Sequence, residues 1–180
     1  MKPEVVFTVG HSTHTLEEFV GLLGVHEVRA LVDVRSTPKS RRMPHFSKES
    51  LAQTLPERGI DYLHLPELGG WRRPVRGSPN SGWTSKGFQG YADHMETEEF
   101  QAALDRLISL AGERRTAYMC AEGLWWRCHR RLLSDALLVR GWTVCHIDPA
   151  GELHEHRLPE FAVVDEDRLT YPPAQRSLNL

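Results

Sequence analysis

Short apolar runs alternate with helix-like segments along most of this 180-residue chain. Five runs with strand character, at residues 5–9, 30–34, 60–65, 116–120 and 143–147, are separated by segments whose apolar residues recur every three or four positions. Strands that alternate with helices are typical of βαβ units, in which parallel strands are covered by helices on both faces. The pattern predicts a single Rossmann-like α/β domain over residues 1–180, a three-layer sandwich with a mostly parallel sheet of about five strands. A C-terminal hairpin is expected around Asp165-Glu166-Asp167.

Capping residues set the expected helix bounds. The predicted N-caps are Thr15, Ser47 and Thr97, and the helix after Ser47 is expected to close at Pro56 and Gly59. Gly24 and Gly141 are the expected C-terminal stops of two helices, the second of which is predicted over residues 127–140 with Cys128 on its apolar stripe. Residues 66–90 are rich in Gly, Pro, Ser and Trp and show little periodicity. They are therefore predicted to form a long loop, and loops of that length in a compact domain are usually functional or disordered.

The composition limits the classes of protein to which the chain can belong. Apolar residues make up 40% and charged residues 26%, which is typical of a globular protein. The net charge of −2 gives no global attraction to nucleic acid, so anion binding requires local clusters of basic residues. No apolar run reaches the roughly 18–20 residues that span a bilayer, and the N-terminus lacks a signal-peptide pattern. We expect a cytoplasmic protein without a membrane partner, whose three cysteines are free thiols.

Polar side chains gather where the predicted strands end. The residues concerned are His11 and Ser12 after the first strand, Asp33, Arg35 and Arg41 after the second, His64, Gly69, Gly70 and Arg72 after the third, and Cys120, Glu122, Cys128, His129 and Arg130 after the fourth. The carboxyl ends of parallel strands share one edge of the sheet, where α/β proteins bind ligands. Guanidinium groups pair with phosphate or carboxylate oxygens two at a time. The sequence therefore predicts an anion-binding edge, and the expected anion is a phosphate group.

Two of the three cysteines lie at this predicted edge. Cys128 at a helix start among arginines would favour a reactive thiolate, although a free cysteine can equally be core packing. Cysteine-dependent phosphatases and sulfurtransferases place a loop of five residues between the cysteine and an arginine, whereas six residues separate Cys120 from Arg127, so the register fails by one. A zinc site from Cys120, Cys128 and His129, with His11 as a fourth ligand, is an alternative, but this spacing is not a compact zinc pair.

Three functional hypotheses follow. In the first, the chain is an enzyme acting on a phosphate-bearing nucleotide or nucleic-acid substrate, and its anion is held by Arg35, Arg41, Arg72 and Arg130. His11, Glu122 and His129 would transfer protons, with Cys120 or Cys128 as nucleophile. In the second, the chain binds nucleic acid or a nucleotide without catalysis and stacks bases on loop tryptophans. The third is a metal- or thiol-dependent enzyme that uses Cys120, Cys128 and His129. No particular cofactor or oligomeric state is indicated.

Several segments together resemble one uncharacterised family. These are Val9-Gly10-His11-Ser12, Val32-Asp33-Val34-Arg35-Ser36, Leu68-Gly69-Gly70-Trp71-Arg72, Met119-Cys120-Ala121-Glu122 and Cys128-His129-Arg130. In order and spacing they are similar to the family described as domain of unknown function 488, with Gly123-Leu124-Trp125 bulkier than expected there. The resemblance implies a compact Rossmann-like domain with a family motif at the strand ends. It implies no reaction, because fold alone does not fix function.

Overall fold

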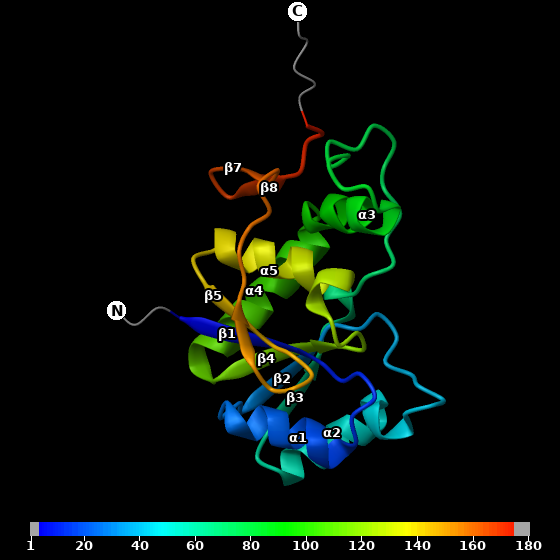
Figure 1. Cartoon of the computed structure of the whole chain (residues 1–180), viewed down its shortest axis with the longest axis vertical. Coiled ribbons are helices and arrows are strands. Elements are labelled where there is room, and N and C mark those ends of the chain that lie inside the picture. The colour runs from blue at the N-terminus through cyan, green and yellow to red at the C-terminus, as the bar shows by residue number, and fades with distance from the viewer. Residues whose placement is uncertain (1–3, 175–180) are drawn as a thin grey trace, which may run out of the picture.

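The computed structural model describes residues 4–174 and shows a three-layer α/β sandwich (Figure 1). The strands are β1 (Val5–Gly10), β2 (Ala30–Asp33), β3 (Asp61–His64), β4 (Thr116–Cys120), β5 (Thr143–Ile147), β6 (Leu153–Glu155), β7 (Val163–Asp165) and β8 (Arg168–Thr170). The α-helices are α1 (Leu16–Val25), α2 (Lys48–Glu57), α3 (Lys86–Met95), α4 (Glu98–Glu113) and α5 (Arg130–Val139). Three short 3₁₀ helices are η1 (Pro44–Phe46), η2 (Pro66–Leu68) and η3 (Trp125–Arg127).

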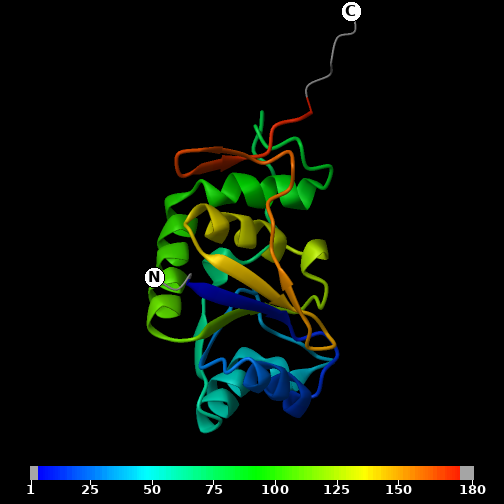
Figure 2. The same ribbon diagram turned by 60° about the vertical axis from the view of Figure 1, so that its left-hand side comes forward.

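The main sheet has six strands in the order β3-β2-β4-β1-β5-β6. The first five are parallel, and β6 pairs antiparallel with β5 at the edge. Helices α1 and α2 cover one face, and α3, α4 and α5 cover the other (Figure 2). The α/β class, the mostly parallel sheet and the β7–β8 hairpin predicted from the sequence are confirmed, and β6 is an additional strand.

Side-chain alternation along the strands separates two cores and also places the site. On β4, Ala117 and Met119 face α1 and α2, whereas Tyr118 and Cys120 face α4 and α5. Cys120 is the last residue of β4, so its thiol lies under α5 at the carboxyl edge of the sheet.

Strands β1 and β4 are parallel neighbours, but the connections that follow them run in opposite directions across the sheet, toward β2 and toward β5. The connection after β1 leads to α1 on one face, and the connection after β4 leads to α5 on the other. Two connections that diverge in this way leave a crevice between their strand ends, the usual binding position in an open α/β sheet.

Gly10 lets the two connections pass closely. A Cβ at Gly10 would lie 1.9 Å from the carbonyl oxygen of Glu122. Only glycine allows the segment after β4 to cross the end of β1 at this distance.

The local sequence signals set most of the helix bounds. Thr15, Ser47 and Thr97 cap α1, α2 and α4 as predicted, and Thr15 forms the full capping box with Glu18. Gly141 follows α5 with a positive φ of 86°.

Four local predictions were wrong. Helix α1 runs one residue past Gly24. Pro56, expected to close α2, lies inside that helix. Residues 66–90 are not all loop, because α3 begins at Lys86 and packs Tyr91 and Ala92 into the core. Helix α5 begins at Arg130 rather than at residue 127, so Cys128 lies before the helix.

No helix in the described part of the chain is long and apolar enough to cross a membrane.

Candidate functional site

A cavity of about 830 Å³ lies at the carboxyl edge of the sheet, between the connections that follow β1, β2 and β4 and the start of α3. We call it the strand-end pocket. Of the predicted site residues, its walls include His11, Arg35, Gly70, Cys120, Glu122, Cys128 and His129. The grouping of polar strand-end residues expected from the sequence therefore brings seven of them to one cavity.

Two thiols lie side by side in the strand-end pocket. The Sγ atoms of Cys120 and Cys128 are 3.3 Å apart, and both cysteines are free. The 3₁₀ helix η3 turns the chain back after β4, and this turn returns Cys128 to the strand end. Cys128 is half-buried, its backbone N–H bonds to the carbonyl of Trp125, and it belongs to no helix.

Arg130 lies beneath Cys120 and is closed to solvent. Its Nε donates to Cys120 Sγ at 3.0 Å, and its Nη1 donates to the Thr8 hydroxyl at 2.8 Å. Its Nη2 donates to the carbonyl of Glu122 at 2.5 Å. The guanidinium is held by three groups, so it acts as a fixed positive charge below the sulfur.

This charge changes the titration of both thiols. Burial raises the pKa of Cys120, but the hydrogen bond from Cys128 and the charge of Arg130 outweigh burial and lower the pKa to about 6. The same hydrogen bond, together with burial, raises the pKa of Cys128. At neutral pH, Cys120 is therefore a thiolate, and Cys128 remains a thiol that donates to it.

The arginine that serves Cys120 is not the one considered in the sequence. Arg127 is exposed on the pocket wall, whereas Arg130, three residues later at the start of α5, reaches the sulfur. The Nε of Arg130 and both of its terminal nitrogens are engaged within the protein. Its place is behind the thiolate, supporting the nucleophile rather than facing a ligand.

One wall of the pocket consists of the Asp33–Arg35 ion pair and the neighbouring His11. The Arg35 guanidinium pairs with both oxygens of the fully buried Asp33, at 2.8 and 2.6 Å, and Tyr62 also donates to that carboxylate. Arg35 Nη1 lies 3.4 Å from His11 Nε2, while His11 Nδ1 donates to the carbonyl of Ser12. Burial lowers the pKa of His11 to about 4, so the ring is neutral at pH 7 with its Nε2 lone pair turned toward Arg35.

A second neutral histidine also lines the pocket. His129 Nε2 donates to the carbonyl of Val34 at 3.0 Å, and burial lowers its pKa to about 4. Gly70 packs against this ring, because a Cβ there would lie 2.9 Å from His129 Nδ1. Gly69 packs likewise on Ser36. The two glycines predicted as ligand-binding residues thus let the segment after η2 approach β2 and α5.

The remaining predicted residues lie around the pocket. Glu122 is exposed and accepts from the backbone N–H of Leu124 at 3.1 Å. His64 donates to the carbonyl of Arg35 from behind the wall. Ser12 has a φ of 47°, and its backbone N–H donates to the carbonyl of Ala121 in the segment that crosses the end of β1. Arg72 is half-buried beside Gly69. Arg41 is exposed and does not line the cavity.

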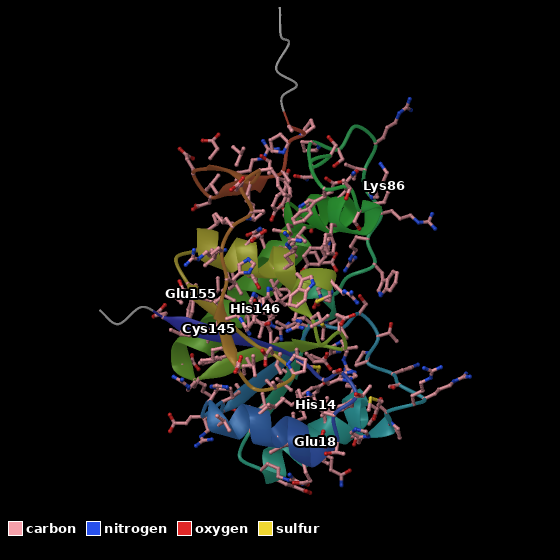
Figure 3. The ribbon with its side chains drawn as sticks, viewed as in Figure 1. His14, Glu18, Lys86, Cys145, His146 and Glu155 are labelled. Carbon is pink, nitrogen blue, oxygen red and sulfur yellow. The ribbon has the colours of Figure 1, made fainter. Side chains whose placement is uncertain are left out.

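A buried hydrogen-bonded chain behind Arg130 was not anticipated from the sequence. The hydroxyl of Thr8 bonds His146 Nδ1 at 2.9 Å, and His146 Nε2 lies 2.9 Å from His156 Nδ1. His156 Nε2 then bonds Asp135 at 2.6 Å, and the Tyr171 hydroxyl donates to the same carboxylate. Figure 3 labels His146 on β5 next to Cys145, whose partner on the edge strand β6 is Glu155. Burial lowers the pKa of His146 to about 2, so this ring is neutral and relays hydrogen bonds only.

A sequence signal for this chain did exist. His146 lies in β5, and Asp135 lies on the buried face of α5. Burying a polar side chain without a hydrogen-bond partner costs free energy of folding. Such residues need buried partners, but their identities depend on strand order.

A cluster of possible metal ligands lies elsewhere in the molecule. Within residues 4–174, the group of three side chains whose ligand atoms lie within 4.8 Å of one another is Asp148, Glu152 and His154, outside the pocket. His129 directs one ring nitrogen to a backbone carbonyl and the other toward Gly70. Within the described part of the chain, Cys120 and Cys128 are not joined by a third such side chain at this distance.

Residues 15–137 match the model of one protein family, described as Domain of unknown function DUF488. The chain belongs to this family. The DUF488 match includes both thiols, Arg130 and the Asp33–Arg35 pair, whereas His11, His146 and Tyr171 lie outside it. Comparisons with curated proteins and with solved structures find no match.

Proposed function

We propose that this protein is a cysteine-dependent enzyme that uses the Cys120 thiolate on a phosphate-bearing substrate, with a nucleotide or nucleic-acid component, held in the strand-end pocket. The observation that carries the proposal is the 3.0 Å hydrogen bond from buried Arg130 to Cys120 Sγ. A desolvated guanidinium under a sulfur at a strand end stabilises a thiolate at neutral pH, and the thiolate is the nucleophilic form of cysteine.

The charge of the pocket supports an anionic substrate. Lys39 and Arg127 lie on its walls, and within residues 4–174 neither forms an ion pair. Arg35 is neutralised by Asp33, so it contributes geometry more than charge. We therefore expect Lys39 and Arg127 to bind the anion, in place of the four arginines that the sequence suggested.

The pocket also supplies groups for proton transfer. Attack by the Cys120 thiolate forms a covalent bond to the electrophilic centre of the substrate, and the leaving group departs with its bonding electron pair. A water molecule then releases the second product from Cys120. Glu122, an exposed carboxylate at the mouth, is the proposed base for that water, and neutral His11 is the second candidate.

Protection from alkylation tests the nucleophile and the anion together. At pH 7 we expect iodoacetamide to modify Cys120 roughly tenfold faster than Cys145, because burial raises the pKa of Cys145. Inorganic phosphate or a nucleoside monophosphate should slow modification of Cys120 and leave Cys145 unchanged. Equal rates at the two cysteines would contradict the nucleophile, and unaltered rates with either anion would contradict the substrate class.

Replacement of Glu122 tests turnover. Glu122→Gln should keep anion protection of Cys120 but abolish turnover, and a substrate adduct should accumulate on Cys120. Mass spectrometry of the variant after incubation with a panel of nucleotides and phosphate esters detects that adduct. Turnover equal to that of the unmodified protein would remove Glu122 from the mechanism.

One observation favours a second candidate, nucleic-acid binding. Trp71 is 99% exposed, has a φ of 64°, and lines the strand-end pocket with Lys39. A fully exposed indole beside basic side chains is suited to stacking on an unpaired base. Trp71→Ala should weaken binding of a short single-stranded oligonucleotide in a salt titration, whereas Val75→Ala in the same loop should not. Binding that is independent of salt, or equal in the two variants, would argue against this candidate.

A further inference from the structure

The position of Cys128 has a chemical consequence beyond support of Cys120. Its Sγ lies 3.3 Å from the Cys120 sulfur, and both thiols line the strand-end pocket. A disulfide requires a separation of about 2.05 Å, so the sulfurs need to approach by roughly 1.3 Å. Cys128 lies in the connection between η3 and α5, where its backbone N–H bonds the carbonyl of Trp125, so the approach is expected mainly from rotation of the two cysteine side chains.

We propose that Cys120 and Cys128 form a two-thiol oxidation site, in which a hydroperoxide oxidises Cys120 and Cys128 then closes a reversible disulfide. This chemistry requires only the two thiols, so it stands apart from the substrate proposed above. Its ligand class is a small hydroperoxide such as hydrogen peroxide, which is small enough to reach a sulfur that is 3% exposed at the pocket floor.

The two thiols have unequal roles. Cys120 accepts hydrogen bonds from Arg130 Nε and from the Cys128 thiol, and it carries the negative charge of the pair. The thiolate is the form that peroxide oxidises, so Cys120 reacts first. Cys128 keeps its proton and is already in contact with the sulfur that becomes electrophilic.

Each step balances. The Cys120 thiolate attacks one oxygen of hydrogen peroxide, the O–O bond breaks, and the departing hydroxide takes a proton to become water. The sulfur of Cys128 then attacks the sulfenic acid of Cys120, the S–O bond breaks, and a second water leaves with the Cys128 proton. Two thiols and one peroxide yield one disulfide and two waters, and the sulfur pair loses two electrons.

Disulfide formation also removes the counter-charge of Arg130. In the reduced protein, the buried guanidinium faces the thiolate. In the oxidised protein, it faces a neutral disulfide, and the nucleophile is no longer available. Oxidation therefore abolishes alkylation of Cys120, and reduction restores it.

The test is oxidation of the whole protein with a few equivalents of hydrogen peroxide at pH 7, followed by intact mass measurement and peptide mapping. We expect the loss of two hydrogen atoms, a single Cys120–Cys128 cross-linked peptide and full reversal by dithiothreitol. Cys145→Ser is the matched control and should behave like the unmodified protein, because Cys145 lies in β5 beside His146 and outside the pocket (Figure 3).

Two variants separate the steps. Cys128→Ser should stop at a Cys120 sulfenic acid that dimedone traps, and Cys120→Ser should form no disulfide. The cross-linked peptide is read in the unmodified protein, so the proposal stays testable if a variant does not fold. Absence of that peptide with normal iodoacetamide reactivity of Cys120 would overturn this proposal alone. Absence of both the cross-linked peptide and the iodoacetamide reactivity of Cys120 would also overturn the proposal that Cys120 is a nucleophile.

Discussion

Thr8 on β1 connects Arg130 to His146. Its hydroxyl accepts from Arg130 Nη1 at 2.8 Å and donates to His146 Nδ1 at 2.9 Å. The donor directions run one way from the guanidinium through the two histidines to Asp135, so each ring needs only one tautomer. A buried chain of this kind holds the guanidinium in one position under Cys120.

Replacing Thr8 by Val tests that positioning role. The change keeps the shape of the side chain but removes the acceptor for Arg130, so the guanidinium is held less firmly at the sulfur. We expect the pH midpoint of Cys120 alkylation to rise above that of the unmodified protein, with little change in the fold. Thr116→Val is the control, because Thr116 is equally buried but bonds only the carbonyl of Arg114. Equal midpoints in both variants would refute the role of Thr8.

Breaking the Asp33–Arg35 pair should cost stability. Asp33→Asn removes the charge that balances Arg35 and leaves a buried cation, at a cost of about 3–5 kcal/mol. Urea denaturation measures this as a lower midpoint. Glu17→Gln serves as the control, because the Glu17–Arg58 pair is exposed and its loss should leave the midpoint nearly unchanged. Similar shifts in the two variants would contradict the special position of the buried pair.

Gly10 should tolerate no side chain. In Gly10→Ala, the new Cβ would displace the Glu122 carbonyl, which accepts from Arg130 Nη2. We expect lower thermal stability and slower alkylation of Cys120 together. Gly21→Ala, with open space around it in α1, should instead stabilise the protein by about 0.5–1 kcal/mol. A Gly10 variant as stable and as reactive as the unmodified protein would show that the crossing can relax.

The buried histidines predict a loss of stability in acid. The pKa values of His11 and His129 are about 4 in the folded protein against 6.5 for the free side chain, and that of His146 is about 2. Between pH 6.5 and 4 the unfolded chain therefore binds protons that the folded chain does not. The free energy of unfolding should fall with decreasing pH by up to about 1.4 kcal/mol per pH unit for each ring.

His11→Asn isolates one of these contributions. Its amide nitrogen can replace Nδ1 as donor to Ser12, but it does not titrate. The slope of unfolding free energy between pH 4 and 6.5 should decrease by about one proton. An unchanged slope would show that His11 is already charged in the folded state.

The sequence predicted much of the fold because the determining signals are local. The capping residues Thr15, Ser47 and Thr97 and the stop at Gly141 are satisfied within a few residues of themselves. Helix α3 was missed because Gly87 and Gly90 weaken its pattern, and its helical state depends on packing of Tyr91 against the core. Cys128 was placed on α5 because its spacing fits a helical stripe, although η3 ends first and the helix starts two residues later.

The sequence alone determined that polar strand-end residues share one edge, because parallel strands end on the same side of a sheet. Tertiary structure decided which of these residues meet. The order β3-β2-β4-β1-β5-β6 places β1 beside both β4 and β5, and so brings Thr8 between Arg130 and His146. The path of the chain through η3 into α5 brings Arg130, rather than Arg127, to Cys120. Strand order and the path of a connection follow from packing between distant segments, and no local pattern encodes them.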